Sequence, residues 1–480
     1  MKKKLLSVLL VAAMVTTMFV GCGNKDKDDT DNATTPTKAA GTTDPTEKPD
    51  DTDTPVASDE GKVLNIHCWN TEFHDRVAAY FPGYVENADG TGTIGDVTVN
   101  WVVTPSQDNA YQNALDAALI AQGDAATDEK VDLFLIEADY ALKYVNAATP
   151  VAMDVTELGL TADDMKDQYQ YTKDIVTDST GVIRGTTWQA TPGLFAYRRS
   201  IAKDVLGTDD PAEVQKKLSN WDDFNAVAAD MKAKGYTMLS GYDDSYRTFS
   251  NNMSGPWVQD GKVVVDENLM KWVDQTKTFT DNAYNNKTSL WADGWTADQS
   301  PAGKTFGFFY STWGINFTLL GNSLADPDAE KAVGNGIYGD WAVTEGPQPY
   351  YWGGTWICGA IGTDNPTLVK EIMYSLTCDA ANMKKITEET QDYTNNQTAM
   401  NELATSDFKS DFLGGQNHIA LFAAAAPKID MSKISPYDQG CNESFQKAFK
   451  DYFDGVVDKD TALQNFYTDV KVKYPELTTD

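Results

Sequence analysis

The sequence predicts an α/β fold with two domains, and three observations support this prediction. Residues 61–480 have ordinary apolar and aromatic content and exceed the length that one hydrophobic core usually supports. Residues 131–136 are almost entirely apolar, as expected for a parallel strand that is covered on both faces. Strand and helix patterns alternate through the first half of this region, which is typical of a doubly wound sheet with flanking helices.

In the first half, residues 63–69 and 97–103 have the period-two pattern of strands. Residues 106–122 follow with a helical pattern, and we expect Ser106 to cap that helix. The apolar strand at 131–136 comes next. Parallel strands need a crossover helix between them, so this order predicts strand–helix–strand units.

In the second half, residues 220–235 predict a helix that begins at a Ser219 or Asn220 cap and ends at Gly235. The later elements are a strand within residues 304–313, a buried strand at 355–362, a helix that starts at Asn365 and Pro366, and a mostly helical C-terminal part.

The first sixty residues have the pattern of an export signal followed by a linker. Lysines at positions 2–4 precede an apolar stretch at 5–20, which is too short and too interrupted for a membrane span. Residues 19–22 (Phe-Val-Gly-Cys) resemble the lipobox of bacterial lipoproteins, so we expect a signal peptide at 1–21 and lipidation of Cys22. Simple secretion is the alternative. Residues 22–60 form the expected lipid-bearing acidic linker, because they lack the large apolar side chains of a core.

The charge balance argues against nucleic acid as a partner. The chain holds 71 acidic and 39 basic residues, for a formal net charge of −32. Phosphate backbones require clusters of Lys and Arg, and the sequence shows none. Such a charge also keeps the body away from an anionic membrane surface, except where a lipid tether holds it near.

The sequence gives no indication of a metal, a cofactor or a catalytic centre. Its three histidines lack metal-ligand spacing, and no nucleophile elbow, zinc-protease motif or phosphate loop occurs. The cysteines of the body also lack such spacing, and we expect them to be buried thiols: Cys68, Cys358, Cys378 and Cys441.

Aromatic and polar side chains follow predicted strands in both halves. Ligands of open α/β sheets bind beyond the carboxyl ends of strands, and sugars need both aromatic faces and hydrogen-bonding groups. Any one of these aromatic residues could equally be core, and Asp139 could be a helix cap. Their recurrence in both halves favours a binding cleft. The candidates are Trp69, Asn70, Glu72, Asp139, Trp188, Tyr242, Asp243, Trp313, Trp352 and Trp356.

The order of six segments resembles the extracellular solute-binding proteins of sugar ABC transporters, the group that includes maltose-binding protein. No single segment is specific, but together they span nearly the whole body. The six segments are residues 64–73 (LNIHCWNTEF), 131–158, 185–207, 220–235 (NWDDFNAVAADMKAKG), 302–317 and 350–377.

The resemblance implies a type II periplasmic-binding-protein-like fold, in which two lobes close around a ligand at a hinge. It places Trp188 and Trp356 near that hinge. We expect lobe 1 to span residues 61–196 with a return segment at 353–380. Lobe 2 would span residues 197–352 with the C-terminal helices at 381–480.

The resemblance further implies a receptor and not an enzyme. Lipid-anchored on the extracellular face of a Gram-positive-type cell membrane, it would capture an oligosaccharide and deliver it to the permease subunits of an ABC importer. We expect a monomer without a cofactor. The alternatives are a receptor of the same fold for a cationic ligand, such as a polyamine or a peptide, which the acidic body would suit, and a cell-surface glycosidase.

Overall fold

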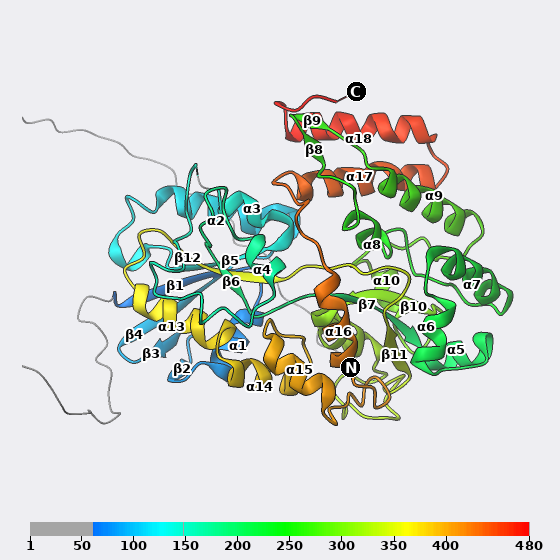
Figure 1. The fold of residues 1–480 in the computed structure, drawn as a ribbon, viewed down its shortest axis with the longest axis horizontal. Coiled ribbons are helices and arrows are strands. Elements are labelled where there is room, and N and C mark those ends of the chain that lie inside the picture. Colours follow the sequence, from blue (N-terminus) through cyan, green and yellow to red (C-terminus); the bar gives the residue numbers. More distant parts are fainter. Residues whose placement is uncertain (1–60, 147, 480) are drawn as a thin grey trace, which may run out of the picture. The chain divides into compact units, whose positions relative to one another are not determined.

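The structure is a computed structural model that describes residues 61–146 and 148–479. The expected signal peptide, the lipidation site Cys22 and the acidic linker lie outside the described residues. The predicted fold class is confirmed, because two sheets with flanking helices form two α/β lobes (Figure 1).

The first lobe contains a seven-stranded mixed sheet with the order β2-β3-β4-β1-β5-β12-β6. The predicted strands at its centre are confirmed, since β1 runs parallel to both β4 and β5. The bounds are β1 (Val63–Cys68), β2 (Tyr84–Glu86), β3 (Gly92–Ile94), β4 (Val97–Val103), β5 (Leu133–Glu137), β6 (Thr186–Thr187) and β12 (Thr355–Gly359). The carboxyl ends of the three parallel strands therefore meet at one edge of this sheet.

The second lobe contains a three-stranded sheet with the order β10-β7-β11. Both neighbours of β7 pair with it in the antiparallel direction, so this sheet is not wound from parallel units. The bounds are β7 (Gly193–Arg198), β10 (Gly307–Ser311) and β11 (Trp341–Thr344). All three strands are buried along their whole length.

The chain passes between the lobes several times. It leaves the first sheet after β6 and enters the second at β7, and it returns from β11 to β12. Helix α14 (Ala380–Thr390) still packs Met383 and Ile386 into the core of the first lobe, although the sequence assigned residues 381–480 to lobe 2. The lobe boundaries at residues 197 and 381 stay a prediction.

Helices cover both sheets. Those of the first lobe are α1 (Glu72–Tyr80), α2 (Ala110–Ala121), α3 (Ala141–Tyr144), α4 (Gln170–Asp174), α13 (Pro366–Thr377) and α14. Those around the second sheet are α5 (Arg199–Leu206), α6 (Pro211–Lys217), α7 (Trp221–Ala233), α10 (Asp293–Asp298), α11 (Thr312–Gly314), α12 (Leu320–Ser323), α15 (Gln397–Thr405) and α16 (His418–Ala425). A π-helix at Ile315–Leu319 joins α11 to α12.

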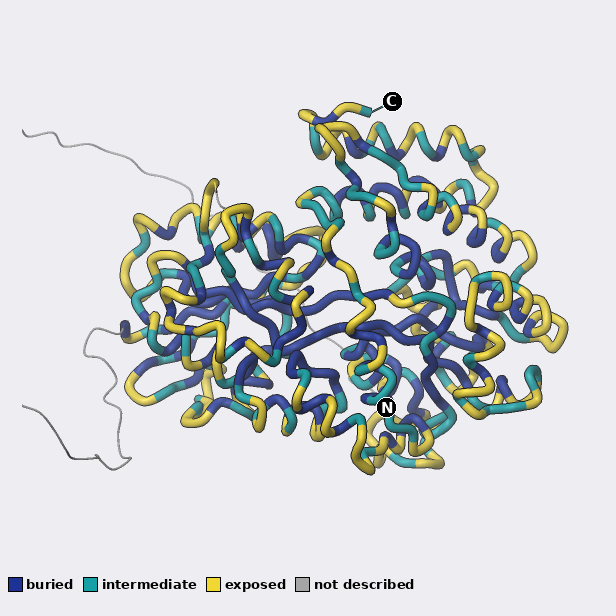
Figure 2. Tube along the Cα trace, in the orientation of Figure 1, coloured by how far each residue is buried: buried dark blue, intermediate teal, exposed yellow. Residues whose placement is uncertain are grey.

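A further group of helices has its own hydrophobic core. Helices α8 (Tyr246–Ser250), α9 (Glu267–Asp281), α17 (Asp438–Phe453) and α18 (Lys459–Lys473) pack together with the short hairpin β8 (Val258–Gln259) and β9 (Lys262–Val263). Figure 2 shows the strands of both sheets as buried segments, while the outer faces of the helices are exposed.

One predicted helix differs in its start. The segment after β4 begins with a short 3-10 turn (Gln107–Asn109), and α2 starts only at Ala110. Asp108 and Asn109 have φ of 54° and 60°, and this left-handed backbone interrupts the helix. The expectation that Ser106 caps the helix was therefore wrong, since its side chain accepts no capping hydrogen bond. The Asn220 cap of α7 is confirmed.

Within the described residues, Cys68, Cys358, Cys378 and Cys441 are buried and free, as the sequence predicted. No helix in this part of the chain is both long and apolar enough to cross a membrane.

Candidate functional site

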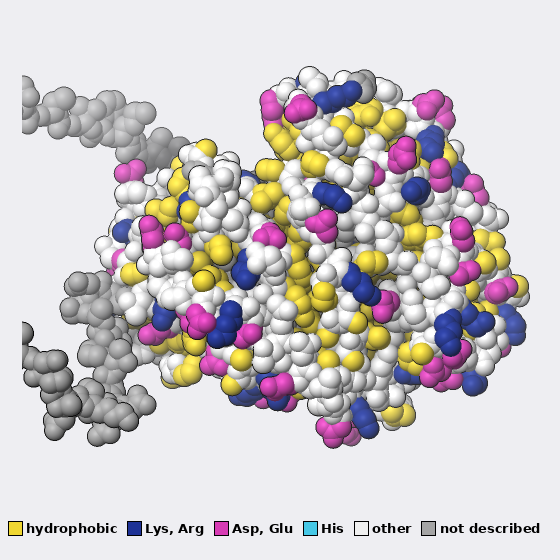
Figure 3. Space-filling model, viewed as in Figure 1, with side chains coloured by type: hydrophobic (Ala, Val, Ile, Leu, Met, Phe, Trp, Pro, Cys, Tyr) yellow, Lys and Arg dark blue, Asp and Glu magenta, His cyan; other side chains and the backbone are white. Residues whose placement is uncertain are grey.

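A cavity of about 1140 Å³ lies between the two lobes, at the carboxyl ends of the parallel strands β1, β4 and β5. Ligands of open α/β sheets bind at this edge. The volume exceeds the range of roughly 300–1,000 Å³ in which drug-sized ligands bind, so the cavity has room for a larger molecule. Figure 3 shows hydrophobic side chains exposed in the middle of the view, with charged side chains spread over the surface on both sides.

The first lobe lines the cavity with side chains that directly follow its strands. Trp69 and Asn70 come after β1, and the Trp69 ring is held edge-on by Tyr111 at a centroid distance of 5.4 Å. The Asn70 Oδ1 atom accepts a hydrogen bond of 3.0 Å from the N–H of Glu72, which fixes the start of α1. This wall therefore offers one half-buried aromatic ring beside polar side chains.

Glu137, the last residue of β5, brings a buried carboxyl group to the same wall. Its Oε2 atom accepts the N–H of Asp139 at 2.9 Å. Burial, with a further contribution from the charge of Asp139, raises the pKa of Glu137 to about 8. At neutral pH this carboxyl group is mostly protonated, so it can donate a hydrogen bond as well as accept one.

The second lobe lines the cavity with an aromatic cluster. Trp313 donates its Nε1 hydrogen bond to the carbonyl oxygen of Trp352 at 3.0 Å, and the two rings meet edge-to-face at 5.2 Å. Trp291 stacks on Trp313 and is 57% exposed, and Phe317 on the π-helix is 66% exposed. Exposed ring faces of this kind suit the C–H faces of a sugar.

Gly353 lies on the crossing segment between the lobes and leaves space between their side chains. Its φ is +68°, and a Cβ atom there would be 3.2 Å from the Trp313 Nε1 atom and 3.4 Å from the Glu137 Oε1 atom. The Trp313 indole N–H and the Glu137 carboxyl group therefore both border the space that a side chain at position 353 would fill.

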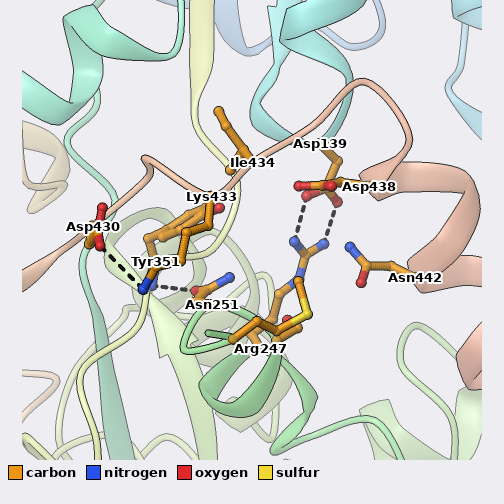
Figure 4. A pocket seen from close by; sticks show the side chains of 11 residues that line it. Asp139, Arg247, Asn251, Tyr351, Asp430, Lys433, Ile434, Asp438 and Asn442 are labelled. Atoms are coloured by element: carbon orange, nitrogen blue, oxygen red, sulfur yellow. Dashed lines mark hydrogen bonds and ion pairs between the residues drawn. The ribbon is translucent and has the colours of Figure 1, made fainter. Parts of the chain in front are cut away.

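An ion pair joins the two lobes at one end of the cavity. Both guanidinium nitrogens of Arg247, on α8, donate to the Asp139 carboxylate at 2.6 and 2.5 Å (Figure 4). A second bond crosses nearby, where Gln439 of α17 donates to Asn109 Oδ1 at 3.0 Å. The two lobes are therefore in direct polar contact in this structure.

Glu72 belongs to a network at the base of the cavity. Arg76 donates to Glu72 at 2.9 Å and to Asp392 at 3.0 Å, and Gln189 donates to Asp392 at 3.1 Å. The side chain of Arg76 is buried over Trp188. Glu72 and Asp392 thus share one guanidinium.

Helix α17 lines the cavity with one polar face. The side chains recur every three or four residues, which places them on the same side of the helix. They are Gln439, Asn442, Glu443, Gln446, Lys447 and Lys450.

The structure brings seven of the ten expected side chains to this cavity. They are Trp69, Asn70, Glu72, Asp139, Asp243, Trp313 and Trp352. The Asp243 Oδ2 atom accepts the N–H of Leu290 at 3.2 Å, and burial raises the pKa of Asp243 to about 6.

The other three expected side chains lie elsewhere. Trp188 is fully buried and stacks on Phe73 at 5.5 Å, while the buried Trp356 donates to the carbonyl oxygen of Thr172 at 2.8 Å. Tyr242 packs on Phe453 in the core of the helical group. All three rings are buried, and none of them lines the cavity.

Sequence reasoning did not select Glu137, Arg247, Trp291 or the polar face of α17. Glu137 and Arg247 stand next to selected residues, so position after a strand and charge could have found them. Trp291 lies in an irregular loop, and the polar face of α17 has the pattern of an ordinary solvated helix. Nothing in the local sequence marks them.

No group of three or more His, Cys, Asp or Glu side chains in the described part of the chain has the geometry to hold a metal ion.

The two α/β lobes, joined by crossing segments and enclosing a cavity, define the class of two-lobed binding proteins.

The family follows from comparison of the sequence. Residues 87–412 match the family described as bacterial extracellular solute-binding protein, and the chain belongs to this family. No curated protein matches the sequence.

Solved structures agree in fold. An extracellular solute-binding protein of family 1 is 18% identical with a TM-score of 0.67, covering 85% of this chain and 99% of its own. A transporter-associated binding protein from B. animalis subsp. lactis, in complex with beta-1,6-galactobiose, is 16% identical with a TM-score of 0.64, covering 88% and 100%. The galacto-N-biose/lacto-N-biose I-binding protein from Bifidobacterium longum is 15% identical with a TM-score of 0.62, covering 88% and 100%.

Proposed function

We propose that this protein is a lipid-anchored extracellular receptor that captures an oligosaccharide for uptake by an ABC importer. Cys22 would carry the lipid, residues 23–60 would serve as a tether, and the monomeric receptor would deliver its ligand to the permease subunits. Membership of the solute-binding family supports a receptor, and the sugar complexes of the solved relatives support the ligand class.

The observation that carries the proposal is the chemistry of the interlobe cavity. Trp69 contributes from the first lobe, and Trp291, Trp313 and Trp352 contribute from the second. Amide and carboxyl side chains lie between them. A sugar ring that stacks on one lobe and hydrogen-bonds to the other favours the closed state, and this differential contact is what a closure mechanism requires.

A cationic ligand is the second candidate, and the lining of the cavity carries charges of both signs. Asp139 is paired with Arg247, and Glu72 shares Arg76 with Asp392. Glu137 is mostly protonated at neutral pH because its pKa is raised. Lys447 and Lys450 add positive charge to the same lining. Asp108, Asp243 and Glu443 add negative charge to it as well. The exposed aromatic faces, and not the net charge of the lining, therefore favour a sugar.

A glycosidase would need two free carboxyl groups that flank the scissile bond. Glu137 and Asp139 are neighbours on the first lobe, but both oxygens of Asp139 are occupied by Arg247. This arrangement suits binding better than nucleophilic attack.

Thermal unfolding against panels of oligosaccharides, polyamines and peptides tests the proposal. A ligand at a hundred times its Kd stabilises the folded state by about 2.7 kcal/mol, so a true ligand gives a clear shift in Tm. We expect at least one oligosaccharide to shift the Tm, and sugar chromatography to show no product over time.

Trp313→Ala should abolish the shift, while Tyr374→Ala, which removes a partly exposed ring on α13 away from the cavity, should keep it. A shift with amines alone would contradict the proposed ligand class.

A further inference from the structure

The Asp139–Arg247 pair is surrounded by more carboxyl groups than one arginine can neutralise. Glu137 and Asp139 come from the end of β5 in the first lobe, and Asp438 comes from the first residue of α17. Figure 4 shows the Asp438 carboxylate beside that of Asp139, with the Arg247 guanidinium pointing at Asp139. Asp139, Arg247 and Asp438 line one small polar cavity of about 20 Å³, which is room for about one water molecule.

The other groups that face this cluster do not supply the missing positive charge. Lys433 lines the same small cavity, but its ammonium lies 3.6 Å from Asp430. Tyr351 contributes a phenol, and Asn442 contributes an amide whose Oδ1 atom accepts from the Tyr246 hydroxyl at 2.6 Å.

Tyr474 is a neutral phenol near Asp438, since burial raises its pKa to about 12. Three further titratable neighbours of the cluster are the phenol of Tyr140 beside Glu137, the phenol of Tyr246 beside Arg247, and the thiol of Cys441 beside Asp438. Burial raises the pKa of each of them above its ordinary value, so all three stay neutral across the physiological range. Three carboxyl groups therefore lie within electrostatic reach of one guanidinium, and only Asp139 is hydrogen-bonded to it.

We infer that Arg247 is a positioning residue that closes the second lobe onto the first through Asp139, and that the surplus carboxyl groups around it make closure depend on proton uptake. The inference rests on the proposed function only for its ligand-binding readout. It assigns a regulation to the cavity: the receptor closes more readily in a mildly acidic medium.

The direction of the pH effect follows from the two surplus carboxyl groups. Burial raises the pKa of Glu137 to about 8 and that of Asp438 to about 7, whereas solvated carboxyl groups ionise near pH 4. The closed form therefore holds protons that a solvated, open form releases. The free energy that proton uptake by Glu137 and Asp438 contributes to closure is fully present below about pH 4. It is lost as the pH rises through 7 to 8.

Small-angle scattering of the ligand-free chain tests the inference without a ligand. We expect the radius of gyration to be larger at pH 8.5 than at pH 5.5. Asp438→Asn and Glu137→Gln should each weaken this dependence, because the amide cannot ionise. Asp164→Asn is the matched control: Asp164 lines neither cavity, accepts hydrogen bonds from Thr161, has a lowered pKa and stays ionised throughout. It should leave the dependence unchanged.

Calorimetry with the oligosaccharide found by thermal unfolding gives the second readout. Titration of one carboxyl group can change Kd by at most tenfold per pH unit. We expect Kd to rise about tenfold from pH 6 to pH 8. We also expect the protein to take up protons when the ligand binds. Arg247→Met should weaken binding at both pH values, and Arg247→Lys should restore part of it.

The inference would be overturned if the radius of gyration of the parent protein did not change with pH. It would also be overturned if Asp438→Asn kept the same pH dependence as the parent. If no oligosaccharide binds at any pH, the proposed function fails, and scattering alone decides the inference.

Discussion

Trp291 stacks on Trp313 with 18° between the ring planes, although its backbone has the left-handed φ of +66°. A bulky residue in this conformation costs on the order of 1–3 kcal/mol. The loop holds it there, because Leu290 donates to Asp243 at 3.2 Å and Ala292 donates to the Ser289 carbonyl oxygen at 3.2 Å. The fold thus retains strain at the mouth of the cavity, where it presents an aromatic ring.

The first prediction compares Trp291→Gly with Trp291→Ala. Both remove the ring, and we expect Kd for the ligand to rise about tenfold, since an aromatic contact contributes roughly 0.5–1.5 kcal/mol. Glycine alone relieves the backbone strain, so Trp291→Gly should be about 1 kcal/mol more stable than Trp291→Ala in urea unfolding. Equal stability of the two variants would show that the backbone is not strained.

The second prediction concerns Trp188, which the sequence placed at the hinge. Because its ring is fully buried and packs against Phe73 and Arg76, Trp188→Ala should lower the free energy of unfolding by about 3–5 kcal/mol. Calorimetry below the lowered Tm should still give a Kd within a fewfold of the parent. A large loss of affinity in a folded variant would place Trp188 in the binding site instead.

The third prediction uses Gly353 with Gly362 as a matched control. Both have positive φ, so alanine strains the backbone at either position. Only at Gly353 would the new Cβ enter the space between Trp313 and Glu137, whereas at Gly362 it would meet Gln122 at an ordinary 3.6 Å. We expect both variants to lose about 1 kcal/mol of stability, and Gly353→Ala alone to lose affinity at least tenfold. Similar Kd values for the two variants would refute the role of this space.

The fourth prediction concerns the anchor. In cells fed a labelled fatty acid, the parent protein should carry label and sediment with membranes, because acyl chains hold a protein by about 0.8 kcal/mol per buried CH₂. Cys22→Ser should lose the label and appear in the medium. Cys378→Ser, which changes a buried thiol of the body, should stay on the membrane. An unlabelled parent protein in the medium would favour plain secretion.

The sequence by itself determined the elements whose signal is local. The strands β1, β4 and β5 and the Asn220 cap of α7 follow from periodicity and capping chemistry. The position of Trp69, Asn70 and Asp139 at one edge follows as well, because parallel strands end on the same side of a sheet.

Only the tertiary structure decided which aromatic rings face the cavity and which groups meet across it. Trp188 and Trp313 both follow strand-like segments. Phe73 stacks on the Trp188 ring and buries it, whereas the Trp313 ring lines the interlobe cavity. Arg247 reaches Asp139 only because the helical group brings α8 to the end of β5. Such contacts join residues far apart in the chain, and burial depends on those distant neighbours rather than on the local pattern of residues.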